Sequence, residues 1–279
     1  MGSAEEDVLS QAVGTTPTSA RRIIAIANQK GGVGKTTTAI NLGTALAAAG
    51  KTVLLVDLDP QGNATTGLGT DRRRRIISTY NVLVEGTSVQ EATHDTGIPN
   101  LSLVPSSRDL SGADLELIDL TSREYRLRKA LRSETLPHQF ILIDCPPALG
   151  LLTVNALAAA DAVLVPLQCE FYALEGLSLL LHAIERIKRS FNSRLEIQGL
   201  VLTMFDKRNN LCDMVAVDVR QHFGDKVYQT VIPRNVRVSE APSHGKPVLL
   251  YDFACAGSQA YVHLAREMLC REVGVIHDA

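Results

Sequence analysis

Short apolar runs alternate with longer helical stretches along most of the chain, from residue 22 onward. Several of the runs are almost continuously apolar, which is typical of strands covered on both faces in a parallel sheet. Strands are predicted at 23–27, 52–56, 101–104, 140–143, 162–166, 197–204 and 227–232, and helices at 36–49, 123–131, 151–159, 174–189, 214–223 and 258–272. This order predicts an α/β fold in which helices flank a doubly wound, mostly parallel sheet, with ligands beyond the carboxyl ends of the strands.

The first 20 residues stand apart from this alternation because they are mostly polar. Such a composition buries too little apolar surface to fold, so residues 1–20 are expected to form a disordered tail. Residues 21–279 are expected to form a single domain, since no internal repeat appears and one doubly wound sheet accounts for the alternation.

One glycine-rich stretch, NQKGGVGKTTT at 28–38, lies between the first predicted strand and the first predicted helix. Glycines let consecutive backbone N–H groups turn toward an anion, and the helix N-terminus adds its positive dipole end. In such a loop Lys35 can reach the β- and γ-phosphates of a nucleotide, and the Thr36 hydroxyl can hold Mg²⁺. The alternative, a glycine-rich turn without a ligand, is disfavoured by the flanking strand and helix.

The loop departs from the usual phosphate-loop pattern G-x-x-x-x-G-K-[ST], which requires glycine where this chain has Gln29. It carries a second lysine, Lys30, at its entrance. This lysine comes too early to duplicate Lys35 on the same nucleotide, which makes the nucleotide of a neighbouring subunit its candidate target.

Three aspartates follow predicted strands. Asp57 and Asp59 end the second strand, and their i, i+2 spacing points both side chains the same way. Asp144 closes the apolar run at 140–143, where a carboxylate of the Mg²⁺ shell is expected. Each aspartate taken singly could instead be a helix cap or a turn former, and the phosphate loop beside them favours the functional interpretation.

Composition narrows the class of protein. The chain has 279 residues, of which 45% are hydrophobic, and a formal net charge of −2, which argues against a surface coated for nucleic acid but allows a local basic patch. Its five cysteines form no C-x-x-C pair, so a reducing compartment is expected, without a disulfide frame or a zinc or iron–sulfur site. No apolar run approaches the roughly 20 residues needed to cross a bilayer.

Five motifs together resemble the ParA/Soj chromosome-partitioning ATPases, which are related to MinD. They are KGGVGKTT at 30–37, DLDPQGN at 57–63, DCPP at 144–147, QCEFYALEG at 168–176 and VIPRNVR at 231–237. The resemblance runs from about Arg22 to Arg271 in conserved order and spacing. It implies a P-loop NTPase of the deviant Walker A type that hydrolyses ATP to ADP and phosphate, weakly alone and faster with a partner and DNA.

The resemblance also implies a homodimer with two ATP molecules sandwiched between the subunits. Lys30 would be the signature lysine that reaches the partner's phosphates, and Gly31 would lie at the dimer face. Asp59 would orient the attacking water, and Asp57 would belong to the switch I region. The implied catalytic residues are Lys30, Lys35 and Asp59. The implied nucleotide site adds Gly31, Gly32, Val33, Gly34, Thr36, Thr37, Pro233 and Asn235, the last two near the adenine. The implied Mg²⁺ ligands are Thr36, Asp57 and Asp144.

For DNA, the resemblance implies contacts from Arg208 and Arg237. No aromatic residues are interleaved with these arginines, so sequence-independent contact with the double-stranded backbone is expected. The densest charge run, Arg72 to Arg75, is expected to be a solvated loop, with phosphate contact as the alternative.

Three other functions fit the sequence less well. A MinD-like regulator that binds membrane would need a basic amphipathic C-terminal helix, which residues 273–279 do not supply. An iron–sulfur carrier would need paired bridging cysteines, and a metabolic kinase an acceptor pocket. The preferred interpretation is a cytoplasmic, nucleoid-associated DNA-partitioning ATPase with ATP and Mg²⁺ as cofactors and a ParB-type protein as partner. The sequence leaves open whether it serves a chromosome or a plasmid.

Overall fold

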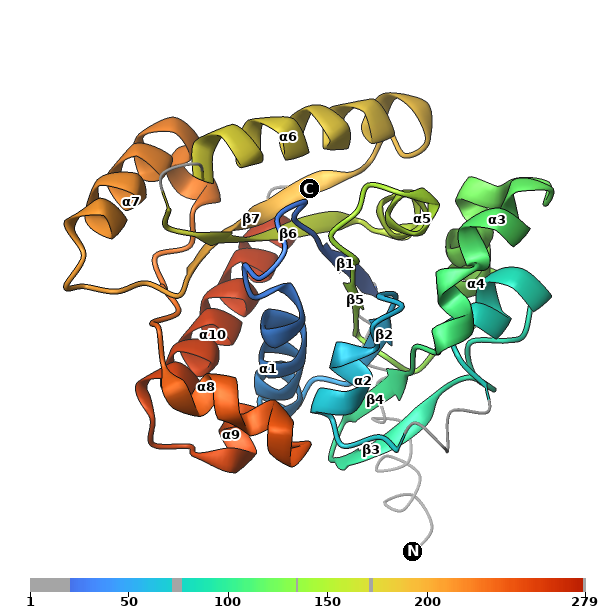
Figure 1. The fold of residues 1–279 in the computed structure, drawn as a ribbon, viewed down its shortest axis with the longest axis horizontal. Helices are drawn as coiled ribbons and strands as arrows, with labels where there is room; N and C mark the ends of the chain where they lie inside the picture. Colours follow the sequence, from blue (N-terminus) through green and yellow to red (C-terminus); the bar gives the residue numbers. More distant parts are fainter. Residues whose placement is uncertain (1–20, 72–76, 134, 171–172, 278–279) are drawn as a thin grey trace, which may run out of the picture.

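The computed structural model describes residues 21–71, 77–133, 135–170 and 173–277, and these residues build a seven-stranded sheet between two layers of helices (Figure 1). The strand order is β3-β4-β2-β5-β1-β6-β7. Only β3 is antiparallel to its neighbour; the other pairs are parallel. The strands are β1 Arg22–Ile26, β2 Val53–Asp57, β3 His94–Ile98, β4 Leu101–Val104, β5 Phe140–Asp144, β6 Ala162–Gln168 and β7 Glu196–Thr203.

Alternate residues of the buried strands face the two helical layers. In β1, Ile23 and Ala25 pack into the apolar cluster on the side of α4, α5, α6 and α7, whereas Ile24 and Ile26 pack into the cluster on the side of α1 and α10. The α-helices are α1 Lys35–Ala48, α2 Asn63–Gly67, α3 Ala113–Ile118, α4 Arg126–Ser133, α5 Leu151–Ala159, α6 Ala173–Ser190, α7 Asn210–Phe223, α8 Val236–Glu240, α9 Val248–Tyr251 and α10 Ala256–His277. The doubly wound, mostly parallel α/β fold is therefore confirmed.

One predicted strand is wrong. Residues 227–232 run beside β7 without forming a strand: Val227 forms an isolated bridge with Leu200, and the next isolated bridge is at Pro233. The N–H groups of Gln229 and Thr230 donate to the carboxylate of Glu267 on α10, at 2.8 and 2.9 Å. A side chain distant in sequence thus takes donors that a strand ladder would need.

The edge strand β3 and the short helices α2, α3, α8 and α9 were not predicted. The sequence of β3 is mostly polar and none of its residues is fully buried, so it lacks the apolar run that marked the central strands. The helices have four to six residues, too short for a helical period to stand out. Residues 1–20 and the Arg72–Arg75 run lie outside the described residues, so the predictions for them stay predictions.

Candidate nucleotide site and DNA-facing surface

The phosphate loop and two of the predicted aspartates meet at the carboxyl edge of three adjacent strands. In the parallel register Ile26 of β1 pairs with Asp144 of β5, and Asp144 pairs with Asp57 of β2. The loop follows β1 directly, so the sheet places the two carboxylates beside it. This is the edge at which open α/β sheets bind their ligands.

The loop has the backbone needed to surround an anion. Gly32 and Gly34 take positive φ angles of 76° and 88°, and Gly34 directly precedes α1. Two hydrogen bonds anchor the loop. The Thr203 hydroxyl donates to the carbonyl of Val33 at 2.8 Å, and the side-chain amide of Asn28 donates to the carbonyl of Pro166 at 2.8 Å. The anchored loop therefore leads directly into the N-terminus of α1, as it does in phosphate-binding loops.

Lys35 lies inside the site and is only 7% exposed. Its ammonium donates to the carbonyl of Lys30 at 3.0 Å. Burial lowers the pKa of Lys35, while the negative charges of Asp144 and Asp59 act in the opposite direction. A buried cation with a backbone carbonyl as its hydrogen-bond acceptor can exchange that acceptor for phosphate oxygens.

Asp144 is fully buried, and neither of its carboxylate oxygens has a hydrogen-bond partner within the described part of the chain. Burial raises the pKa of Asp144 well above its usual value, and the charge of Asp57 raises it further; the Thr36 hydroxyl and Lys35 oppose the shift. Buried carboxylate oxygens normally have hydrogen-bond partners. The two unpartnered oxygens of Asp144 are therefore suited to binding a cation or the water molecules around it. The donor set of Thr36 and Asp144 fits Mg²⁺, which typically takes one or two carboxylates, waters and substrate phosphates.

Asp57 is buried too, but its oxygens are engaged. One accepts hydrogen bonds from the Thr65 amide at 2.8 Å and the Thr65 hydroxyl at 2.5 Å, and the other accepts one from the Asp59 amide at 3.3 Å. Burial raises the pKa of Asp57 to about 6, although the bonds from Thr65 act to lower it. Asp57 therefore fastens α2 to the end of β2.

Asp59 lies closer to the solvent of the site, with 8% of its surface exposed. Its carboxylate accepts a hydrogen bond from the Gln61 amide at 2.9 Å, and its backbone carbonyl accepts one from the Ser106 hydroxyl at 2.7 Å. The backbone of this segment is fixed, while the carboxylate retains lone pairs for a further donor such as water.

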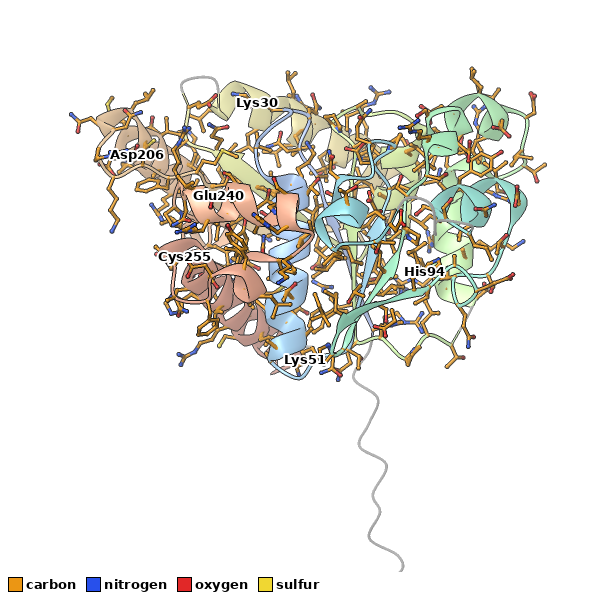
Figure 2. The ribbon with its side chains drawn as sticks, turned by 60° about the horizontal axis from the view of Figure 1, so that its bottom comes forward. Lys30, Lys51, His94, Asp206, Glu240 and Cys255 are labelled. Carbon is orange, nitrogen blue, oxygen red and sulfur yellow. The ribbon has the colours of Figure 1, made fainter. Side chains whose placement is uncertain are left out.

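Lys30 and Gly31 are both exposed at the mouth of the loop. Figure 2 shows Lys30 there. The Lys30 ammonium forms an ion pair with the carboxylate of Glu170, which follows β6. A Cβ added to Gly31 would meet no atom within 4 Å. Nothing within the described chain therefore requires glycine at position 31. A requirement for glycine there would have to come from another molecule.

The two residues expected near the adenine are brought to the loop by the tertiary fold. Pro233 and Asn235 line a pocket of about 210 Å³ together with Gly34, Thr37 and Tyr261. The Asn235 side chain also caps α8, accepting hydrogen bonds from the amides of Arg237 and Val238 at 2.9 and 3.4 Å. The pocket therefore extends from the phosphate loop to the N-terminus of α8.

Both arginines expected at DNA are exposed, and both are paired with acids. The Arg208 guanidinium forms two bonds to Asp206, at 3.0 and 2.9 Å, which lower the pKa of that carboxyl to about 2. Arg237 pairs with Glu240 at 3.0 Å and with Asp252 at 3.4 Å. Figure 2 shows Asp206 and Glu240 at the same side of the molecule.

The backbone joins the regions that carry these two arginines. The Arg234 amide donates to the Phe205 carbonyl at 3.0 Å, so the loop holding Arg208 lies against the segment that leads into α8. Beside it is a hollow of about 690 Å³ whose lining includes Lys207, Arg208, Arg234 and His263. Cationic groups thus gather next to the adenine-side pocket, with which the hollow shares Pro233 and Arg234.

Comparison with known proteins gives the family. A family model described as an AAA domain matches residues 21–197. The chain is 63% identical over 253 residues to chromosome partitioning protein ParA of Caulobacter vibrioides, covering 90% of this chain and 95% of that protein. The chain belongs to the ParA/Soj family of chromosome-partitioning ATPases.

The chain is also similar to a Soj protein in sequence and to a solved structure in fold. Identity to the sporulation initiation inhibitor protein Soj of Bacillus subtilis is 53% over 247 residues, covering 88% of this chain and 98% of Soj. A crystal structure described as cobyrinic acid a,c-diamide synthase from Mycobacterium smegmatis with bound ADP and magnesium is 36% identical, with a TM-score of 0.78, and covers 89% of this chain and 94% of that one.

Two residues of this ParA/Soj chain received no role from the sequence. Thr65 holds Asp57 from eight positions further along the chain, and no regular spacing marks it. Glu170 lies in one of the motifs that carry the family resemblance, but its ion pair with Lys30 joins residues 140 positions apart.

Among the described residues, no helix is both long and apolar enough to cross a membrane.

Proposed function

We propose that this ParA/Soj ATPase is a nucleotide-gated DNA binder. ATP closes a homodimer, the dimer binds double-stranded DNA without regard to sequence, and a ParB-type partner stimulates hydrolysis, which releases the DNA. The observation that carries the proposal is the mouth of the phosphate loop, where an exposed second lysine adjoins a glycine that the monomer does not need.

The nucleotide would be bound by groups already in place. The amides of the loop from Gly31 to Thr36 would hold the phosphates, and Lys35 would leave the Lys30 carbonyl to neutralise the β- and γ-phosphates. The base would enter the pocket beside Pro233 and Asn235. Discrimination of ATP from ADP would then depend on Lys35 and on contacts with the γ-phosphate.

Mg²⁺ would be held by the Thr36 hydroxyl and the Asp144 carboxylate. When bound, it would neutralise charge on the phosphate oxygens. Asp57, whose oxygens are engaged by Thr65 and Asp59, would support this site electrostatically and hold the switch segment in place. The Asp59 carboxylate would accept a hydrogen bond from the attacking water and orient it toward the γ-phosphorus.

Closure of the dimer would bring the partner's Lys30 to the phosphates. The phosphate-loop stretch 28–38 itself contains no arginine, so positive charge on the transferring phosphoryl group would come in trans from this lysine. Gly31 would allow the two backbones to approach at the dimer face.

Dimerisation would also couple ATP to DNA. Two copies of Arg208 and Arg237 on one assembly double the number of phosphate contacts that a monomer offers. Asp206 and Glu240 neutralise these arginines in the monomer, which makes a single copy a weak DNA binder. Such a protein would reside in the cytoplasm on the nucleoid.

The test is a DNA titration by interferometry with ATP and with ADP, at several salt concentrations and with two unrelated duplexes. Binding should need ATP, be equal for both duplexes and weaken steeply with salt, by a log–log slope of about −0.9 for each phosphate contacted. Charge reversal in Arg208→Glu or Arg237→Glu should weaken binding to both duplexes alike and leave ATP-driven dimerisation intact. Equal DNA affinity in the two nucleotide states would refute the proposal.

A further inference from the structure

An apolar groove of about 650 Å³ lies between the C-terminal end of α1 and the helices α9 and α10. Ala45 and Ala49 of α1 form one wall, and Leu269 of α10 forms part of the other. Phe253 lines the groove yet remains 60% exposed, although an aromatic side chain of this size is usually buried. A groove of this volume and composition suits several apolar side chains rather than an ion.

The groove is at the far end of α1 from the phosphate loop. Figure 2 shows Lys30 and Lys51 at the two ends of this helix, whose 14 residues span about 20 Å. A dimer closed over the nucleotides would join the Lys30 ends of the subunits. It would leave the groove open, so the groove needs another occupant.

The described chain begins close to this groove. Arg22, the first residue of β1, pairs with Glu272 of α10 at 3.2 Å. Glu272 is one helical turn beyond Leu269, which lines the groove. The Arg22 side chain therefore contacts α10 about one turn beyond a residue that lines the groove. The matched family model begins at residue 21, so this segment lies outside it.

The sequence of that segment complements the groove. Val8, Leu9, Ala12 and Val13 are spaced so that a helical turn would place them on one face, and Glu5, Glu6 and Asp7 directly precede them. The groove contains one cation, Arg266, which makes no ion pair with any residue that the structure describes. Seven residues lie between Val13 and Arg21, so the eight Cα–Cα steps that join them can span up to about 26 Å of extended chain.

We propose that residues 5–13 of the chain's own N-terminal segment dock in this groove in cis. The apolar residues at 8, 9, 12 and 13 cover Phe253 and Leu269, and the preceding acids pair with Arg266. The docked segment joins the C-terminal ends of α1 and α10. The proposal does not depend on DNA binding or on the dimer.

Cys270 provides a reporter, because it lines the groove and is exposed. The full-length protein is treated with a thiol-modifying reagent, and modification of each cysteine is followed by peptide mass spectrometry. We expect Cys270 to react about tenfold faster in Leu9→Asp than in the unaltered chain, since a buried aspartate would release the segment. Thr15→Asp is the matched control outside the apolar set, and Cys255, which is absent from the groove lining, is the internal reference.

A charge test separates docking from nonspecific shielding. Arg266→Glu should also expose Cys270, and Glu5→Lys with Glu6→Lys in the same chain should restore its protection. Equal Cys270 rates in the unaltered chain and Leu9→Asp would overturn the proposal. Protection that survives Leu9→Asp and grows with protein concentration would assign the groove to a second copy and likewise overturn it.

Discussion

The ammonium of Lys30 pairs with the carboxylate of Glu170, which lies 140 residues further along the chain, on the segment after β6. Both side chains are more than 40% exposed, so the pair contributes only about 0–1 kcal/mol. The lysine that we propose to act in trans is therefore held by its own subunit, in a contact weak enough to be exchanged for a phosphate.

Removing this contact should favour the dimer. Glu170→Gln frees Lys30 without shortening the side chain, and we expect ATP-dependent dimerisation to strengthen by up to about fivefold, with unchanged ATP affinity in the monomer. Analytical ultracentrifugation with a non-hydrolysable ATP analogue measures this. Glu185→Gln, which removes the exposed i, i+4 pair with Arg189, is the control. Weaker dimerisation in Glu170→Gln would show that Glu170 assists the interface instead.

Nucleotide binding should depend on Lys35. Lys35→Gln removes charge-assisted hydrogen bonds to the phosphates, and we expect ATP affinity to fall by about 10- to 150-fold in calorimetry. The fold should be unaffected, because burial already disfavours the charged form of this lysine in the absence of nucleotide. Lys51→Gln, at the other end of α1, is the matched control. Unchanged ATP affinity in Lys35→Gln would overturn the nucleotide site.

Gly31 should be needed only by the dimer. Because a Cβ there meets no atom within 4 Å, Gly31→Val should fold and bind ATP normally. Its side chain should clash across the proposed interface, so light scattering should show monomers with ATP, and DNA binding should be lost. Lys30→Ala should still bind ATP but should no longer couple ATP binding to hydrolysis. ATP-dependent dimers of Gly31→Val would contradict the sandwich arrangement.

Asp59 should serve hydrolysis and not binding. Asp59→Asn keeps an acceptor for the Gln61 amide while removing the charge, and Asp59→Ala removes both. We expect both variants to bind ATP and dimerise, with hydrolysis reduced by about 10²- to 10⁴-fold and dimers that persist longer. The measurement is phosphate release in the presence of DNA and partner. Normal release would transfer the water-orienting role to Asp57.

Asp206 should weaken DNA binding by neutralising Arg208. Asp206→Asn breaks the two-bond ion pair and should raise DNA affinity in the ATP state, whereas Arg208→Glu should lower it. Asp218→Asn makes the same charge change at an exposed position of α7 and serves as the control. Equal DNA affinities of Asp206→Asn and Asp218→Asn would show that the change in net charge alone accounts for the effect, and that freeing Arg208 adds nothing to DNA binding.

Features that depend on neighbouring residues could be predicted from the sequence. The phosphate loop is a continuous stretch, so its glycines, Lys35 and the start of α1 could be predicted together. The central strands could be predicted because burial on both faces requires unbroken apolar runs. The meeting of Asp57 and Asp144 followed as well, since parallel strands end at one edge of a sheet.

Features that depend on contacts between residues far apart in the sequence became visible in the folded chain. Glu267 takes the amides of Gln229 and Thr230 and so prevents the strand predicted at 227–232. Glu170 reaches Lys30, and α10 packs against α1 to leave the groove beside Phe253. No local pattern encodes such pairs, because a side chain's hydrogen-bond or packing partner is set by the path of the whole chain.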